Sequence, residues 1–157
     1  FIAVADRLTK LWVQAVISPY DTVPVIPDVF NLVYTRNRGA AFGLFATASE
    51  TVRLIVLVGF SLAILALIAF MLWQATRPAS LAPWVHRTSL SLILGGASGN
   101  LYDRIVEGSV TDFLQVFLGS YEWPSFNVAD SAISIGACLM AYELLFSKES
   151  KHVPETH

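Results

Sequence analysis

The chain of 157 residues has little charge and almost no cysteine. Charged residues make up 14% of it and hydrophobic residues 55%, whereas soluble domains average roughly 25% charged residues. The single cysteine, Cys138, excludes a disulfide framework within the chain and a metal site built from several cysteines. The formal net charge of −2 provides no basic surface for nucleic acid. A soluble enzyme, a disordered segment and a nucleic-acid-binding protein are therefore poor fits to this composition.

Long apolar runs predict membrane spans. Residues 54–73 carry no charged side chain, and as a helix they would measure about 30 Å, the thickness of a bilayer core. Weaker runs at 1–17, 84–102 and 128–146 are close to the length of a tilted span. Because the chain does not begin with methionine, we expect part of the first span to lie upstream. The prediction is an all-α membrane protein, a bundle of four transmembrane helices forming a single domain over residues 1–157.

The connections between the runs predict the two sides of the membrane. Residues 18–50 include a β-favouring stretch, so we expect a small extracytoplasmic β-containing segment there, which could act as an outer cradle. Residues 105–126 are expected to form an outer loop that could act as a flexible cover. The basic residues in the other connection and in the tail favour a cytoplasmic location for both termini, although two arginines lie on the opposite side. These basic residues are Arg77, Arg87, Lys148 and Lys151, against Arg36 and Arg38.

Polar side chains inside apolar runs are functional candidates, because burying them in a membrane is costly. Asp6 and Lys10 are four residues apart on one helical face, which fits a self-neutralising ion pair or an anchor to another helix. Asn100, Asp103 and Arg104 fall within one helical turn, where they can face the bundle interior or reach water at the interface.

The fourth apolar run begins with a polar pair that has two interpretations. Asn127 suits the N-cap position of a helix and Asp130 suits the third helical position, so capping alone explains both. We also expect Asp112 at the same face of the membrane. Two partly shielded carboxyl groups that lie close together can share a proton near neutral pH, which is the chemistry of aspartic proteases.

Metal and helix-packing patterns are less informative. The three histidines do not cluster with cysteine or acidic residues at a zinc spacing, so we predict no metal site and no cofactor. Gly95 and Gly99 have the spacing that lets two membrane helices approach closely.

Five sequence blocks in a fixed order resemble those of the bacterial lipoprotein signal peptidases, also called signal peptidase II. The blocks are 6–10 (DRLTK), 37–43 (NRGAAFG), 95–104 (GGASGNLYDR), 110–113 (VTDF) and 126–130 (FNVAD). The resemblance implies an intramembrane aspartic endopeptidase of the bacterial cytoplasmic (inner) membrane with its active site near the outer face. Such an enzyme removes the signal peptide from diacylglyceryl-modified prolipoproteins, cutting just before the lipid-bearing cysteine.

The resemblance also implies roles for individual residues. Asp112 and Asp130 correspond to the catalytic dyad. Substrate-binding or dyad-supporting roles are implied for Asn37, Asn100, Arg104 and Asn127, and structural roles for Asp6, Lys10 and Asp103. The implied partners are the prolipoprotein, membrane lipids and a globomycin-type inhibitor, with no nucleic acid.

Two other interpretations are compatible with the polar residues. The first is a small proton- or cation-coupled membrane transporter that uses the same acidic groups. The second is a structural membrane subunit that uses its glycines for assembly and tolerates replacement of Asp112.

Overall fold

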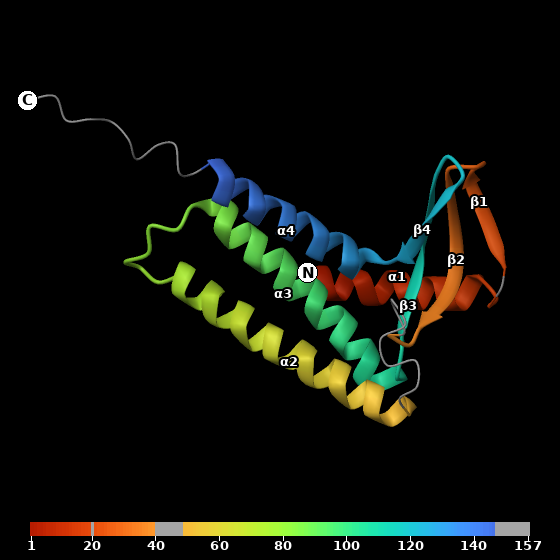
Figure 1. Cartoon of the computed structure of the whole chain (residues 1–157), viewed down its shortest axis with the longest axis horizontal. Helices are drawn as coiled ribbons and strands as arrows, with labels where there is room; N and C mark the ends of the chain where they lie inside the picture. The colour runs from red at the N-terminus through yellow and green to blue at the C-terminus, as the bar shows by residue number, and fades with distance from the viewer. Residues whose placement is uncertain (20, 40–48, 147–157) are drawn as a thin grey trace, which may run out of the picture.

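A computed structural model describes residues 1–19, 21–39 and 49–146. Four helices in this part of the chain form an elongated bundle, and a sheet covers one end of it (Figure 1). The helices are α1 (Ile2–Val16), α2 (Glu50–Ala75), α3 (Trp84–Glu107) and α4 (Val128–Phe146). Each of the four predicted apolar runs therefore corresponds to a helix. Helix α2 extends beyond its predicted run at both ends, and α3 extends beyond its run at the C-terminal end.

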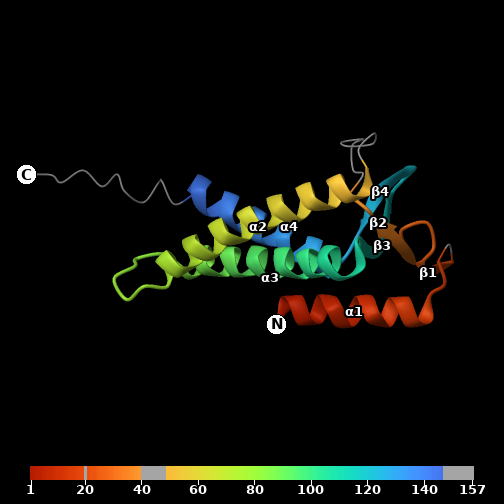
Figure 2. The same ribbon diagram turned by 90° about the horizontal axis from the view of Figure 1, so that it is seen from below.

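The helices differ in how apolar they are. Within the described residues, α2 and α4 are the two that are long and apolar enough to cross a membrane by length and composition. Helix α2 has a side chain exposed or half-buried at nearly every position, with Ala75 its one buried residue. Helix α3 contacts the other three helices, and Figure 2 shows α1 running beside α3 on the side away from α2. An exposed apolar helix and a polar central helix are what a lipid-facing bundle with an internal polar site requires.

The β structure extends beyond the predicted segment at 18–50, because residues 105–126, expected as an outer loop, form the end of α3 and a hairpin. Helix α3 continues to Glu107, and the remaining residues form the hairpin of β3 (Val110–Leu118) and β4 (Tyr121–Phe126). Together with β1 (Thr22–Ile26) and β2 (Phe30–Asn37) they make an antiparallel sheet in the order β1-β2-β3-β4. Residues 110–118 form a strand because β2 supplies a neighbouring strand for them to pair with, with Leu32 opposite Leu114.

The sheet is attached to the bundle by a small apolar core. Val13 and Ile17, from α1 and the residue that follows it, pack with Phe113 of β3, and all three are buried. Helix α3 is capped by Gly108, the residue after Glu107, whose positive φ of 69° is a common way to terminate a helix. The short distance from this glycine to β3 places the start of the strand directly beside the polar end of α3.

Candidate active site

The start of α4 is fixed by two reciprocal hydrogen bonds. The Asp130 backbone N–H donates to Asn127 Oδ1 at 2.9 Å, and the Asn127 backbone N–H donates to Asp130 Oδ2 at 3.3 Å. This is a capping box, in which each side chain satisfies a backbone donor of the first turn. The capping prediction is confirmed. It also has a second effect, since it orients both side chains at the end of the helix.

Asp112 lies beside this helix terminus and is almost completely buried, with 3% of its surface exposed. Its Oδ1 accepts from Asn127 Nδ2 at 2.8 Å, and its Oδ2 accepts from Asn37 Nδ2 at 3.0 Å. Strand β3, the end of β2 and the start of α4 therefore meet at one carboxyl group.

The carboxyl of Asp130 is held from a different helix. Its Oδ1 accepts from Asn100 Nδ2 of α3 at 2.7 Å. With the capping bond to Oδ2, each of the four carboxyl oxygens of Asp112 and Asp130 accepts one hydrogen bond. Asn127 is bonded to both residues, so these two carboxyl groups, called the dyad below, belong to one network.

Burial alters the acidity of Asp112. Loss of solvent raises its pKa from 3.8 to about 6, and the nearby charge of Asp130 acts in the same direction. The hydrogen bonds from Asn37 and Asn127 and the positive charge of Lys10 act the other way, so they lower the pKa. Asp112 therefore changes protonation state close to neutral pH, as an acid–base group must.

The side-chain amides of the three asparagines in the network are oriented in the same way. In each, the side-chain oxygen accepts from a group that can only donate, and the nitrogen points toward the dyad. Asn37 Oδ1 accepts from the Gly39 N–H at 2.8 Å, and Asn100 Oδ1 accepts from Lys10 Nζ at 3.0 Å. Asn127 Oδ1 accepts from the Asp130 N–H, as described above. The amide groups are thus oriented from one side and donate to carboxyl groups on the other.

A buried ionic cluster on α1 borders this network. The predicted pair of Asp6 and Lys10 is confirmed, with 2.6 Å between Oδ2 and Nζ. Lys10 Nζ also lies 2.6 Å from Asp103 Oδ2. On the half-exposed side, Arg7 pairs with Asp103 at 3.4 Å and with Glu107. The cluster joins α1 to α3 with opposite charges placed face to face, which makes burial of these groups tolerable.

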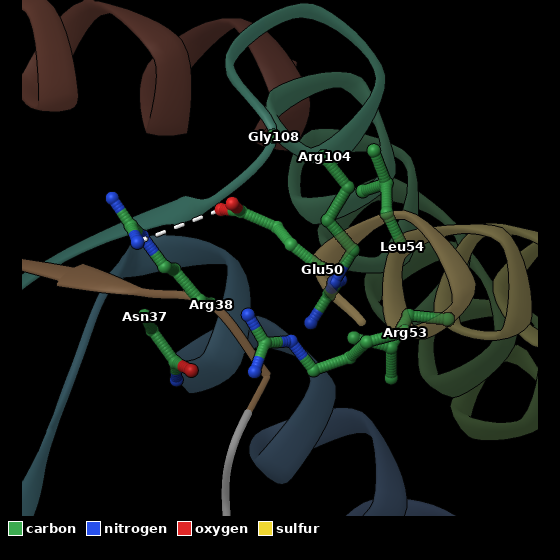
Figure 3. A pocket seen from close by; sticks show the side chains of 8 residues that line it. Asn37, Arg38, Glu50, Arg53, Leu54, Arg104 and Gly108 are labelled. Carbon is green, nitrogen blue, oxygen red and sulfur yellow. Dashed lines mark ion pairs between the residues drawn. The ribbon is translucent and has the colours of Figure 1, made fainter. Parts of the chain in front are cut away.

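Arg104 is close to the dyad without a direct bond to it in the described part of the chain. Its Nη1 donates to the backbone oxygen of Asn100 at 3.2 Å. Figure 3 shows Arg104 and Arg53 pointing into a pocket that Asn37 also lines, with Arg38 and Glu50 paired at its edge at 3.5 Å. Guanidinium groups suit carbonyl and carboxylate oxygens as ligands.

A larger cavity of about 640 Å³ reaches one member of the dyad. Asp112, Asn37 and Arg53 line it together with residues of β4 such as Pro124. Its size is within the range of ligand-binding clefts. Sequence reasoning did not identify Arg53, and its one signal was a cation at the start of an apolar run.

All nine candidate residues lie in or beside this network. Part of the block 37–43, namely Ala40 to Gly43, lies outside the described residues, as do Lys148 and Lys151. In the described part, no group of three or more histidine, cysteine, aspartate or glutamate side chains is arranged to hold a metal ion. Glu143, far from the dyad along α4, pairs with His86 at 2.9 Å.

Comparisons with known proteins agree on one family. The sequence pattern of the family described as signal peptidase (SPase) II matches residues 1–146. A lipoprotein signal peptidase of Solibacter usitatus is 46% identical over 143 residues, covering 91% of this chain and 85% of the relative. A second, from Desulforapulum autotrophicum, is 43% identical and covers 94% of this chain and 88% of the relative.

Two solved structures of bacterial membrane enzymes share this fold. A bacterial membrane enzyme determined by the in meso method at 2.3 Å resolution superimposes with a TM-score of 0.79 at 29% identity, covering all of this chain and 90% of that one. A 1.9 Å structure with the same description has a TM-score of 0.78 and covers 93% of this chain and 88% of that one. The transporter alternative finds no support among these relatives. The chain is a peptidase and belongs to the signal peptidase II family.

Proposed function

We propose that the chain is an intramembrane aspartic endopeptidase that uses Asp112 and Asp130 to remove the signal peptide from diacylglyceryl-modified prolipoproteins. Cleavage takes place just before the lipid-bearing cysteine. Family membership supports signal-peptide removal and a prolipoprotein substrate. The observation that carries the aspartic mechanism is the shared network, in which Asn127 bonds to both Asp112 and Asp130.

The proposed reaction needs one protonated and one ionised carboxyl group. Asp112, with its pKa raised to about 6, is the candidate acid, and Asp130 is the candidate base. Asp130 takes a proton from water while the water oxygen bonds to the scissile carbonyl carbon. Asp112 gives its proton to the carbonyl oxygen. Asp130 gives its proton to the leaving nitrogen as the carbon–nitrogen bond breaks, and Asp112 takes a proton back from a hydroxyl of the tetrahedral intermediate as the new carboxyl group forms.

The surroundings of the dyad support a peptide substrate. Asn37 and Arg104 present polar groups near the cavity that Asp112 lines, where they can hold substrate carbonyl oxygens. Strands β1 and β2 belong to the proposed outer cradle, residues 18–50, and the hairpin of β3 and β4 belongs to its proposed cover, residues 105–126. A globomycin-type peptide inhibitor would occupy the same cavity.

The proposed setting is the bacterial cytoplasmic membrane. In this proposal all four helices cross the bilayer, both termini lie in the cytoplasm, and residues 1–157 act as one membrane-embedded domain. The exposed apolar surface of α2 and the composition of α4 support contact with lipid. The sheet and the dyad then lie at the outer interface, where a lipid-anchored substrate can enter sideways and water is available.

The dyad assignment is tested with two conservative variants. Asp112→Asn and Asp130→Asn each keep the shape of the side chain and remove its acid–base chemistry. Each should lower the rate of cleavage of a purified lipidated prolipoprotein by roughly 10²- to 10⁴-fold, measured by mass spectrometry of the released product. Glu143→Gln is the matched control, because it neutralises another acid of α4 that pairs with His86 away from the dyad. A near-normal rate in either aspartate variant, with folding intact, would reject the aspartic mechanism.

A further inference from the structure

Lys10 makes more polar contacts than its ion pair with Asp6 alone. Its side chain is 0% exposed; its Nζ donates hydrogen bonds to Asp6 and Asn100 and forms an ion pair with Asp103. Asp6 Oδ2 and Asp103 Oδ2 each lie at 2.6 Å and Asn100 Oδ1 lies at 3.0 Å. The two carboxylates compensate the lysine charge, and the hydrogen bond to Asn100 is a further contact that links Lys10 to the dyad network.

That contact, together with Asn127, whose Nδ2 donates to the same Asn100 oxygen at 3.2 Å, determines which end of Asn100 faces Asp130. An ammonium group can only donate hydrogen bonds, so it holds the amide oxygen of Asn100. The amide nitrogen must then point the other way, where it donates to Asp130 Oδ1 at 2.7 Å. With the opposite orientation, the amide oxygen would face a carboxylate oxygen and repel it. Lys10 therefore acts on Asp130 through one intervening side chain.

Its partner Asp6 holds the same part of α4. Asp6 Oδ1 accepts from the backbone N–H of Ala129 at 2.9 Å, next to Asp130 in the chain. Gly99 of α3 makes room for this carboxylate, since a Cβ at that position would lie 2.7 Å from Asp6 Oδ2. The pair on α1 thus reaches the backbone beside Asp130 and the amide that binds its side chain.

We infer that Lys10 is a positioning residue for the proposed dyad, which it serves by orienting the Asn100 amide toward Asp130 and by adding a fixed positive charge near Asp112. The inference rests on the proposed function. It goes beyond the structural role that the resemblance implies for Lys10, because it predicts an effect on proton transfer that is separable from folding.

The charges around the dyad define the direction of that effect. Helix α1 contributes Asp6 and Lys10, and helix α3 contributes Asp103 and Arg104. Arg53 of α2 lines the adjoining cavity, and β2 contributes the neutral Asn37. The positive charge of Lys10 lowers the pKa of Asp112 against the effect of burial. Loss of this charge raises that pKa, so the alkaline side of the pH profile should move to higher pH.

The test compares variants that keep the buried charges balanced. Lys10→Met alone leaves Asp6 and Asp103 facing each other, so it is combined with Asp6→Asn, whose oxygen can still accept from Ala129. The remaining buried acid, Asp103, keeps Arg7 as its partner. The reference is Asp6→Asn alone, which differs from the double variant by Lys10 only. Lys10→Arg tests rescue, and Arg7→Gln is the matched control, because it removes a charge from the same cluster without a bond to Asn100.

Steady-state cleavage of lipidated prolipoprotein is measured across pH together with the apparent melting temperature. Relative to Asp6→Asn, the double variant should have a kcat lower by roughly 10- to 100-fold with KM little changed, as expected for a misplaced catalytic group. The alkaline limb of its kcat/KM profile should move up by about half a pH unit or more. Lys10→Arg should recover most of kcat, and Arg7→Gln should leave the limb in place.

Two results would overturn the inference. One is a folded double variant with the kcat and pH profile of Asp6→Asn. The other is failure of every lysine variant to fold, since Lys10 would then support the structure and have no separable effect on the dyad. Neither result touches the proposed function, which depends on the separate outcome for Asp112→Asn and Asp130→Asn.

Discussion

Asp112→Asn should stabilise the protein at alkaline pH while it abolishes cleavage. The reason is that burial makes ionised Asp112 unfavourable in the folded state and raises its pKa to about 6. A carboxyl group whose pKa is raised by folding binds its proton more tightly in the folded chain. Its contribution to stability is therefore complete below pH 3.8 and is lost as pH rises through about 6. An amide has no such dependence.

The size of the effect follows from two opposing contributions. The rise in pKa of about 2 units corresponds to about 3 kcal/mol at 1.36 kcal/mol per unit, and the wild-type protein loses this amount between acid and alkaline pH. The substitution also removes one acceptor oxygen, although Asn37 and Asn127 both donate to this side chain. One unmet donor costs about 1 kcal/mol at every pH. The variant should be less stable than the wild type by about 1 kcal/mol at pH 3 and more stable by about 2 kcal/mol at pH 8.

Thermal unfolding in detergent provides the assay. A change of 1 kcal/mol shifts the melting temperature by about 2–4 °C in a chain of this size, so the difference between variant and wild type should change by about 6–12 °C from pH 3 to pH 8. The control is Glu143→Gln, which removes an acid paired with His86. A difference between Asp112→Asn and the wild type that stays constant with pH would refute the reasoning, because the burial of the charge would then carry no energetic consequence.

Two further predictions follow from the same geometry. The kcat/KM of the wild-type enzyme should fall as pH rises through about 6, because Asp112 is proposed to act in its protonated form; a rate profile without an alkaline limb would exclude Asp112 as the acid. Gly99→Ala should lower the melting temperature and the cleavage rate, since a Cβ would lie 2.7 Å from Asp6 Oδ2 and displace α1. Gly59→Ala in α2 is its control, because a Cβ there meets nothing within 4 Å and should be neutral or stabilising.

Features set by residues close together in the chain were predictable. The apolar run at 54–73 lies within α2, and the spacing of Asn127 and Asp130 anticipated the capping box. The spacing of Asp6 and Lys10 anticipated their ion pair. In each case the partners are at most four residues apart along a helix, so helical geometry alone brings them together.

Features that depend on distant partners were not predictable from pattern. The hairpin of β3 and β4 contains Gly119 and Pro124, which resemble loop residues, and it becomes a sheet by pairing with β2 far away in the chain. The bond from Asn37 to Asp112 depends on that register, which shifts between Leu32 and Thr35. Only a defined strand pairing, including its irregularity, places the amide on the carboxyl.

The use of asparagine around the dyad has a chemical reason that the network makes clear. Each carboxyl oxygen needs a donor to hold it in place, but a guanidinium or ammonium in direct contact would favour the ionised form strongly and lower the pKa of the acid. Neutral amides hold the group with a smaller effect, and Asp112 keeps a pKa of about 6 while Asn37 and Asn127 both donate to it. An amide also has two different ends. Its oxygen can be held by the scaffold, through a backbone N–H or Lys10, while its nitrogen acts on the carboxyl. Positive charge is thereby kept one side chain away from the dyad, close enough to influence it and too far to form an ion pair with it.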